Sequence, residues 1–306
     1  MLYFQRFINI KIHSRISNTM TAWQSSQIFI CGTARNCAAH LDAVFANINK
    51  LAGLFQDYRI IIAFDKASEE STDNSKDETL LKLKQHKQIH GGKMDVLVNR
   101  NPLSKHRTQN ICNARNTYLN RIRDIALIED YAAKYFIAFD MDDACAGKMD
   151  VEVFKRAMER EEKWDSVSFN RTGYYDAWAL SVDEYVYSCW GWWSPYEVID
   201  HMRNYIIDKL TNTPADEFVE CHSAFSGFAV YKTALFLNCN YDWRMPKRYM
   251  KLEELQRQQK ILWGVGSISP LEEQTDEPDC EHRAFHMQAI HENGARIRIS
   301  PEKLFV

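Results

Sequence analysis

The 306-residue sequence contains no apolar run close to the roughly 20 residues that a membrane-spanning helix requires. It also has no internal repeat and no low-complexity linker, so it does not resemble a repeat array or a string of linked modules. Its formal net charge is -3 and its pI is near 6.4, so it lacks the basic surplus that nucleic-acid binding uses. We therefore expect no nucleic-acid partner, and any anionic ligand should be small.

The spacing of the cysteines excludes a Cys-x-x-Cys motif and a cysteine-rich zinc site. The eight cysteines include no Cys-x-x-Cys pair and no spacing typical of zinc ligands. Most lie in apolar surroundings, which is typical of reduced cysteines that pack in a core. The 45% hydrophobic content is ample for such a core. These features predict a globular protein of a reducing compartment, and we expect it in the cytoplasm.

The N-terminal segment is short of negative charge. Residues 1–41 contain no Asp or Glu, whereas Arg6, Lys11 and Arg15 are basic. Two interpretations stay open for residues 1–26, namely a poorly ordered leader or an amphipathic segment that lies on a membrane surface. The second would add a peripheral membrane association to the cytoplasmic location. The sequence does not indicate an oligomeric state.

Short apolar runs alternate along the chain with segments of helical periodicity. The runs lie at residues 27–32, 58–65, 94–100, 135–140, 165–170, 225–231 and 295–300. The first four runs are continuous and rich in β-formers, which indicates a sheet covered on both faces. The alternation predicts a single α/β domain with a mixed, mostly parallel sheet flanked by helices. In such sheets ligands bind beyond the carboxyl ends of the strands.

The residues that follow the first runs are of the types that bind phosphates and metal ions. The first run is followed by "TARN" at residues 33–36, and the second ends in Asp65. The third is followed by Arg107, Arg115 and several amides. Arginines bind phosphate oxygens bidentately, and carboxylates bind hard cations. The combination predicts a phosphorylated ligand held through a divalent metal.

The stretch "YFIAFDMDD", residues 135–143, places three acids directly after the fourth apolar run. One acid would be enough to cap the helix that is predicted to follow. Three carboxylates at one strand end repel one another unless a cation lies between them. We therefore predict that Asp140 and Asp142, with Asp143 beside them, mark a metal site.

Ordered motifs give the sequence a family resemblance. The Asp-x-Asp motif at Asp140 and Asp142, preceded by "TARN", "FDKASEESTDNS" and "HRTQNICNARN", resembles the nucleotide-diphospho-sugar (GT-A) glycosyltransferases over residues 27–301. More narrowly, "ICNARNTYLNRI", "FIAFDMDD", "FNRTGYYDAWAL" and "CEHRAFH" with "NGARIRISP" resemble the fungal capsule-associated α-mannosyltransferases and related viral and microbial transferases. The resemblance implies a hexosyltransferase whose GT-A-like domain covers residues 27–306, with a nucleotide-sugar half at 27–143 and an acceptor half at 144–306.

The resemblance also implies the donor side of the site. Residues implied to contact the base or ribose are Thr33, Arg35, Asn36 and Asp65, and those implied at the diphosphate or ribose are Arg107 and Arg115. Asp140 would face the ribose, or the metal through water, and Asp142 would ligate Mn²⁺ or Mg²⁺ between the two phosphates. The implied donor is a nucleotide-diphosphate sugar, with GDP-mannose favoured and a UDP-sugar as the alternative.

The second half of the chain is predicted to bind a glycan acceptor. Nine residues between Tyr174 and Tyr196 are Tyr or Trp, and aromatic faces stack on sugars. Candidate acceptor contacts are Trp178, Trp190 and Trp192. Asp176 is a catalytic candidate in the same segment. Gly227 stands where related enzymes keep a glycine beside the donor sugar.

One departure from the family pattern bears on the mechanism. Glu281-His282 stands where inverting relatives carry Glu-Asp and use the Asp as base. Glu281 and His282 are therefore catalytic candidates, and the replacement of Asp by His282 favours a retaining reaction. The family's metal-binding histidine usually follows the last strand, where this chain has none. Either His286 or His291 would take its place, with His286 as our candidate, or the metal would have only aspartate, phosphate and water ligands.

Two other functions stay open on sequence grounds. A haloacid-dehalogenase-like phosphohydrolase would use Asp140 as its nucleophile, because "DMDDA" superficially fits that motif. A non-catalytic glycan-binding module would keep the fold and the aromatic segment without binding a nucleotide in a metal-dependent way.

Overall fold

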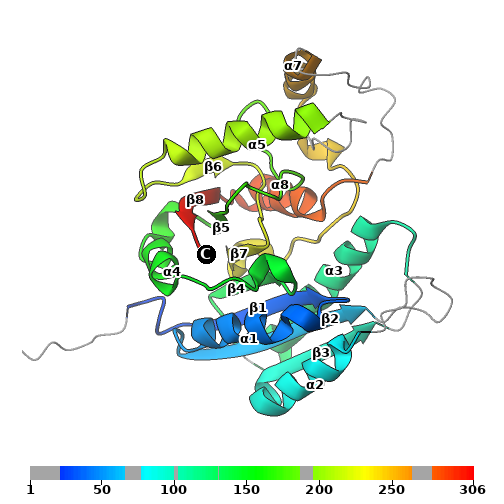
Figure 1. The fold of residues 1–306 in the computed structure, drawn as a ribbon, viewed down its shortest axis with the longest axis vertical. Helices are drawn as coiled ribbons and strands as arrows, with labels where there is room; N and C mark the ends of the chain where they lie inside the picture. Colours follow the sequence, from blue (N-terminus) through cyan, green and yellow to red (C-terminus); the bar gives the residue numbers. More distant parts are fainter. Residues whose placement is uncertain (1–20, 66–76, 100–102, 130, 187–195, 264–277) are drawn as a thin grey trace, which may run out of the picture.

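The computed structural model describes residues 21–65, 77–99, 103–129, 131–186, 196–263 and 278–306. These residues form one α/β domain around an eight-stranded sheet (Figure 1). The strands are β1 (Gln27–Ala34), β2 (Asp57–Asp65), β3 (Met94–Asn99), β4 (Tyr135–Asp140), β5 (Ser166–Asn170), β6 (Val219–Cys221), β7 (Phe228–Lys232) and β8 (Ile297–Lys303). The α-helices are α1 (Ala38–Ala52), α2 (Thr79–His90), α3 (Arg107–Ile128), α4 (Val151–Met158), α5 (Tyr196–Thr211), α6 (Thr233–Phe236), α7 (Leu252–Trp263) and α8 (Glu281–Asn293).

The strand order in the sheet is β3-β2-β1-β4-β7-β5-β8-β6. Strands β3, β2, β1 and β4 run parallel to one another, as do β5 and β8. Strand β7 is antiparallel to both β4 and β5, and β6 is antiparallel to β8. The predicted single α/β domain with a mixed, mostly parallel sheet is therefore confirmed. The sequence does not predict β6, because a three-residue strand carries too little periodicity.

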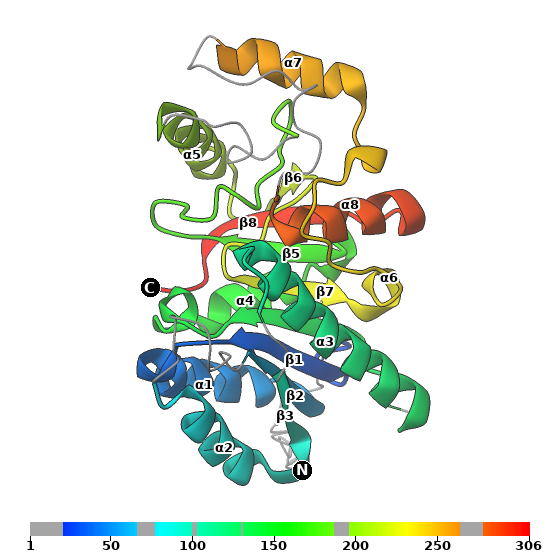
Figure 2. The ribbon, with the colours of Figure 1, turned by 90° about the vertical axis from the view of Figure 1, so that its right-hand side faces the viewer.

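Helices cover both faces of the sheet, which is why the central strands are apolar throughout. Along β1, Ile28 and Ile30 pack into a core with α1, α2 and α4, whereas Phe29 and Cys31 pack into a second core with α3, α5 and α8. Figure 2 shows α1 and α2 on one side of the parallel strands and α3 on the other. In α1, Leu41, Val44 and Ile48 are buried at helical spacing, so its apolar stripe faces the sheet.

The folded structure starts before the first strand. Trp23, within the segment predicted as a leader, is 3% exposed. Its ring packs edge-on against Phe55 at 5.4 Å and Phe154 at 6.2 Å between ring centroids. Burial of this large ring anchors residues 21–26 to the core. The preceding residues 1–20, on which the expected membrane contact rests, lie outside the described residues.

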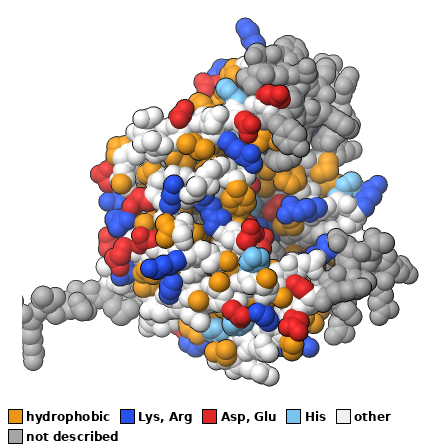
Figure 3. All heavy atoms as spheres, viewed as in Figure 1, with side chains coloured by type: hydrophobic (Ala, Val, Ile, Leu, Met, Phe, Trp, Pro, Cys, Tyr) orange, Lys and Arg blue, Asp and Glu red, His pale blue; other side chains and the backbone are white. Residues whose placement is uncertain are grey.

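The face shown in Figure 3 has no single-sign charge patch. On the face shown in Figure 3, basic and acidic side chains are interspersed. No helix among the described residues is both long enough and apolar enough to cross a bilayer. The seven cysteines that the structure describes are all buried and are not paired with one another, in keeping with a packing role.

The sheet topology brings the polar strand ends together. Because β1, β2, β3 and β4 are parallel, their carboxyl ends share one edge of the sheet, where Thr33 lies opposite Asp140 and Asp65 lies opposite Asn99. Strand β7 runs the other way, so the turn before it, with Gly227, lies at the same edge beside Asp140. The first half of α3 and the first turn of α8 also reach this edge.

Candidate active site

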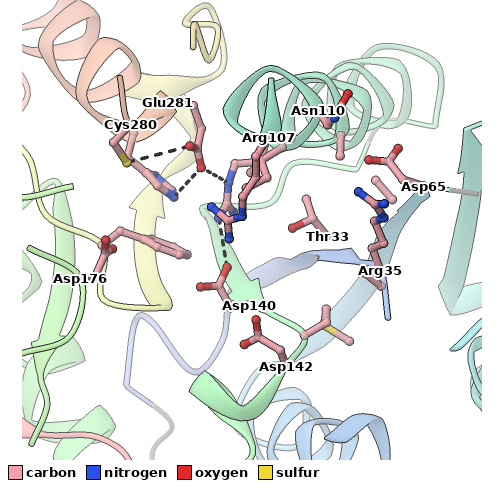
Figure 4. Close-up of a pocket in the computed structure, with 18 of the residues that line it drawn as sticks. Thr33, Arg35, Asp65, Arg107, Asn110, Asp140, Asp142, Asp176, Cys280 and Glu281 are labelled. Carbon is pink, nitrogen blue, oxygen red and sulfur yellow. Dashed lines mark hydrogen bonds and ion pairs between the residues drawn. The ribbon is translucent and has the colours of Figure 1, made fainter. Parts of the chain in front are cut away.

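A cavity of about 380 Å³ opens at the carboxyl edge of β1, β2 and β4. The first half of α3, the start of α8 and the segment around Trp178 form its other walls (Figure 4). The predicted site residues that line it are Thr33, Arg35, Asp65, Arg107, Arg115, Asp140, Asp142, Asp176, Trp178, Glu281 and His282. The fold therefore brings residues from both halves of the chain to one cavity.

Other predicted site residues lie elsewhere. Asn36 is exposed, with a left-handed φ of 50°, and is not part of the cavity lining. Gly227 lies behind Asp140 and Tyr175 rather than in the lining. Trp190 and Trp192, the other predicted acceptor contacts, lie outside the described residues.

Asp65 forms a buried end wall of the cavity. It is 6% exposed at the end of β2, and its Oδ1 accepts a hydrogen bond of 2.9 Å from Asn99 Nδ2 at the end of β3. Burial raises the pKa of the Asp65 carboxyl, although Asn99 and Arg35 oppose that rise. A carboxylate fixed in this way is suited to accept hydrogen bonds from a ligand that enters the cavity.

Arg115 links the two halves of the site. This side chain of α3 is 3% exposed, and its Nε donates to Glu281 Oε1 at 2.8 Å while Nη2 donates to Asp140 Oδ1 at 3.1 Å. The guanidinium also lies over the ring of Phe225 at 4.6 Å. Nη1 is buried without a hydrogen-bond partner among the described residues. Arg115 thus pairs with two carboxylates but balances the charge of only one, and its Nη1 keeps its donors for a ligand.

Asp140 is held from three sides. Its backbone N–H donates to Gly227 O at 2.8 Å, Oδ1 accepts from Arg115, and Oδ2 accepts from the Tyr175 hydroxyl at 3.2 Å. Burial, the largest cause, raises the pKa of the Asp140 carboxyl; Arg115 opposes the rise and Asp142 and Asp176 add to it, which brings the pKa to about 7. Acidic groups are therefore crowded at the tip of β4, which disfavours ionisation of Asp140 unless a cation is present.

Tyr175 is a site residue that the sequence does not single out. Its ring is 43% exposed, whereas the neighbouring Tyr174 is fully buried. Two turns in left-handed conformation face each other here, with φ of 73° at Gly173 and 37° at Tyr174, and 58° at Ser226 and 83° at Gly227. A Cβ at Gly227 would lie 2.8 Å from the Tyr175 hydroxyl oxygen. Backbone strain of this kind persists where the surrounding structure fixes it, commonly at functional sites.

Asp142 and Asp143 have different environments. Asp142 is exposed, lines the cavity, and caps the short 3₁₀-helix Asp143–Cys145 by accepting a 3.1 Å hydrogen bond from Ala144 N through Oδ1. Asp143 is exposed and lies outside the cavity lining. The capping role and a role toward a cation are therefore compatible for Asp142, since each carboxylate has more than one acceptor site.

The donor set at the tip of β4 fits a hard divalent cation. Within the part of the chain that the structure describes, no three His, Cys, Asp or Glu side chains are grouped so as to hold a metal by themselves. Mg²⁺ and similar ions are usually held by one or two carboxylates together with substrate phosphates and waters. Asp140 and Asp142 supply that number of carboxylates, and the excess of acidic groups around them favours a cation.

Asp176 and Trp178 form the wall opposite β1. Asp176 Oδ2 accepts from Ser226 N at 3.0 Å and Oδ1 accepts from Ala179 N at 3.3 Å, so its carboxylate fastens two backbone segments together. Burial raises the pKa of Asp176, while the Ser226 N–H lowers it. Trp178 is half-buried and lines the cavity. Asp176 is therefore a structural tie as well as a candidate for substrate contact.

Glu281 and His282 begin α8 at the cavity. Glu281 is 5% exposed and paired with Arg115, and its Oε1 lies 3.6 Å from His282 Nε2. His282 stacks on Phe225 with 3.8 Å between ring centroids. Burial lowers the pKa of His282 well below its ordinary value, and Arg115 and His286 lower it further. The imidazole is therefore neutral at physiological pH.

His286 does not reach the aspartates. It is buried on the next turn of α8, outside the cavity lining, with Nδ1 3.0 Å from Ser223 Oγ and Nε2 3.1 Å from the Tyr231 hydroxyl. Burial lowers its pKa to about 3, with Arg283 and Arg115 adding to the effect. Both ring nitrogens are engaged within the core, so the placement indicates a packing role rather than the implied metal ligation.

No family model matches the chain, and no curated protein matches it either. Its fold has similarities among solved structures. The crystal structure of S. aureus TarS 1-349 is 14% identical with a TM-score of 0.41, over 91% of this chain and 59% of that one. The same protein in complex with UDP-GlcNAc is 13% identical with a TM-score of 0.41, over 91% and 57%.

A third similar structure is the mannosyltransferase PcManGT from Pyrobaculum calidifontis in complex with GDP-Man and Mn²⁺. It is 13% identical with a TM-score of 0.38, over 90% of this chain and 56% of that one. The chain thus spans less than two thirds of each of these proteins. Similarity at this level does not establish a shared function, which has to be argued from the site itself.

Proposed function

We propose that this protein is a metal-dependent glycosyltransferase that moves a hexose from a nucleoside diphosphate sugar to a hydroxyl group of a glycan acceptor. One observation supports this most directly. A single cavity joins the acidic tip of β4, with Asp140 and Asp142, to the exposed guanidinium of Arg107 and the buried carboxylate of Asp65. These groups match the three parts of such a donor, namely its metal, its phosphates and its nucleoside.

On the donor side, each residue has a defined task. Asp142, with Asp140 beside it, would hold Mn²⁺ or Mg²⁺, which when bound neutralises the charge that grows on the leaving diphosphate. Arg107, at the start of α3, contacts phosphate oxygens, and Asp65 accepts hydrogen bonds from the base or ribose. We propose GDP-mannose as the first donor to test and UDP-sugars as the second.

On the acceptor side, the described residues offer no strong free base. Both oxygens of Asp176 accept backbone N–H bonds, and Glu281 is paired with Arg115. His282 lines the cavity, but its lowered pKa makes it a weak base. This supports a retaining reaction, in which the leaving phosphate assists removal of the acceptor proton.

A phosphohydrolase that uses Asp140 as nucleophile is less well supported. Arg115 and Tyr175 donate to Oδ1 and Oδ2 of Asp140, which lowers the nucleophilicity of both oxygens but leaves lone pairs that can ligate a cation. The glycan-binding module uses the same cavity without a nucleotide, so nucleotide binding separates it from the transferase.

The proposal is tested by thermal-shift measurements with GDP, UDP, GDP-mannose and UDP-sugars, each with Mn²⁺ and with a chelator. One base is expected to raise the melting temperature only with metal, since ligand at about 100 times Kd adds about 2.7 kcal/mol of stability. Absence of a shift with every nucleotide would contradict the transferase. Glycan binding without nucleotide binding would support the module instead.

The Tyr175 hydroxyl is expected to matter for metal binding. In Tyr175→Phe, Asp140 loses the donor that fixes its Oδ2, so Mn²⁺ binding has to order this carboxylate, which costs about 1 kcal/mol. We expect Mn²⁺ affinity in the presence of GDP or UDP to fall about fivefold, measured by calorimetric titration. Tyr174→Phe is the matched control, since the Tyr174 hydroxyl is buried without a partner among the described residues. Equal Mn²⁺ affinities in the two variants would exclude this role.

A further inference from the structure

A second hollow, also of about 380 Å³, lies between the segment Asn240–Tyr249 and α8. We call it the basic hollow, because its charged lining residues are Arg244, Lys247 and Arg248 with a single acid, Asp242. Asn240, Tyr249 and Gln288 complete its polar lining. This concentration of positive charge stands out in a chain whose net charge is -3. The ligand that it suits is therefore an anion.

Both arginines of the hollow are held in place by the protein. Arg244 is fixed by Asp242, to which Nε donates at 3.1 Å and Nη2 at 3.0 Å. The guanidinium of Arg248 lies 4.5 Å over the ring of Tyr249. Cations that are already positioned lose less conformational entropy when an anion binds.

Tyr249 is itself fixed. Its ring stacks with His291 at 5.1 Å and 15°, and its hydroxyl donates to Glu292 Oε1 at 2.7 Å. Gln288 donates to the other oxygen of Glu292 at 3.0 Å, and its own Oε1 accepts from Asn240 N at the same distance. Glu292 is therefore engaged in fixing Tyr249 and Gln288 in the wall of the hollow.

The lining also suits a sugar. Besides its charged groups, it contains the apolar Met245, Pro246 and Ala284 and the amides of Asn240 and Gln288. Saccharides present hydroxyl groups and apolar C–H faces together, so they are bound by amides, charged groups and apolar surfaces in combination. A bare inorganic anion would use only the basic groups.

The basic hollow adjoins the acceptor side of the candidate active site. Helix α8 starts in the cavity with Glu281 and His282, and Ala284 and Gln288 further along it line the hollow. The chain just before α8 is tied to the hollow's own segment, because Asp279 N donates to Trp243 O at 2.7 Å. An oligosaccharide with one end in the cavity could thus extend toward the hollow.

We propose that the basic hollow binds an acidic sugar of the acceptor, so that the transferase acts on an anionic glycan. That the sugar belongs to an acceptor rests on the proposed function, but binding of the acidic sugar can be tested by itself. Charge-assisted hydrogen bonds to Lys247 and Arg248 recognise the carboxylate or phosphate group, while the Asn240 amide and the apolar Met245 and Pro246 contact the ring.

The test compares binding of trigalacturonate, maltotriose and inorganic phosphate by calorimetric titration. The wild type is expected to bind trigalacturonate more tightly than the other two. The double variant Lys247→Gln/Arg248→Gln should weaken that binding at least about tenfold, since losing even one charge-assisted bond of about 1.5 kcal/mol has that effect. Lys84→Gln/Lys87→Gln on α2, an exposed pair of the same charge, is the matched control and should bind as the wild type does.

Each alternative outcome has a distinct meaning. No trigalacturonate binding by the wild type, or equal binding by both double variants, would overturn the inference. Phosphate binding as tight as that of trigalacturonate would overturn recognition of a sugar. Metal-dependent shifts with GDP or UDP, recorded on the same samples, test the transferase separately. If the wild type binds trigalacturonate but shows no metal-dependent shift with GDP or UDP, the transferase is contradicted and the acidic-sugar site is still supported.

Discussion

Asp142→Asn is expected to abolish the metal-dependent thermal shift with nucleoside diphosphate and to lower kcat/KM by about 10²–10³-fold, the usual effect of losing one electrostatic contact to a transition state. Asparagine keeps the size of the side chain, and its carbonyl oxygen can still accept the Ala144 N–H bond that caps the short helix. The change thus removes the negative charge and leaves the local fold. The measurements are thermal shift and initial rates with Mn²⁺ titrated from zero.

Asp143→Asn is the matched control for this variant. The two aspartates are adjacent and both exposed, but Asp143 lies outside the cavity lining. Asp143→Asn should therefore keep the metal-dependent shift and the rate of the wild type. Equal losses in both variants would indicate a general electrostatic effect, and an unaffected Asp142→Asn would place the metal elsewhere.

Much of the donor side is predictable because it depends on local patterns. Continuous apolar runs predict strands buried on both faces, and parallel strands bring their carboxyl ends to one edge. Thr33, Asp65 and Asp140 are therefore expected together before any contact is known, and the structure places all three in one cavity.

The rest depends on packing between distant segments, which periodicity does not encode. Arg115 and Glu281 pair across 166 positions of sequence, and that pair exists only because α3 and α8 pack side by side. Likewise, the pattern of the adjacent Tyr174 and Tyr175 does not tell which ring faces the cavity. The turn at Gly173 and Tyr174 decides it, because both residues have left-handed φ angles. A bulky tyrosine rarely adopts this conformation, so the sequence does not reveal the turn.

Arg283→Met is expected to destabilise the protein by about 3–5 kcal/mol, the cost of leaving one partner of a buried ion pair alone. Arg283 is fully buried, and its Nε donates to the buried Asp279 at 2.9 Å. Its other nitrogens donate to the carbonyl groups of Trp178, Leu180 and Val186 and to the Ser181 hydroxyl. Methionine has a similar length but supplies none of these bonds.

The same side chain ties the wall that carries Trp178 to the helix that carries Glu281, so its loss should also loosen the cavity. Urea unfolding followed by circular dichroism measures the stability, and Arg244→Met is the control. Arg244 and Asp242 form a similar pair that is 59% and 42% exposed, and removing an exposed pair costs about 1 kcal/mol or less. The double variant Asp279→Asn/Arg283→Met should recover part of the loss, because no buried charge is then left unpaired. If Arg283→Met costs no more than Arg244→Met, the buried network does not hold the wall, and the position of Trp178 must depend on apolar packing alone.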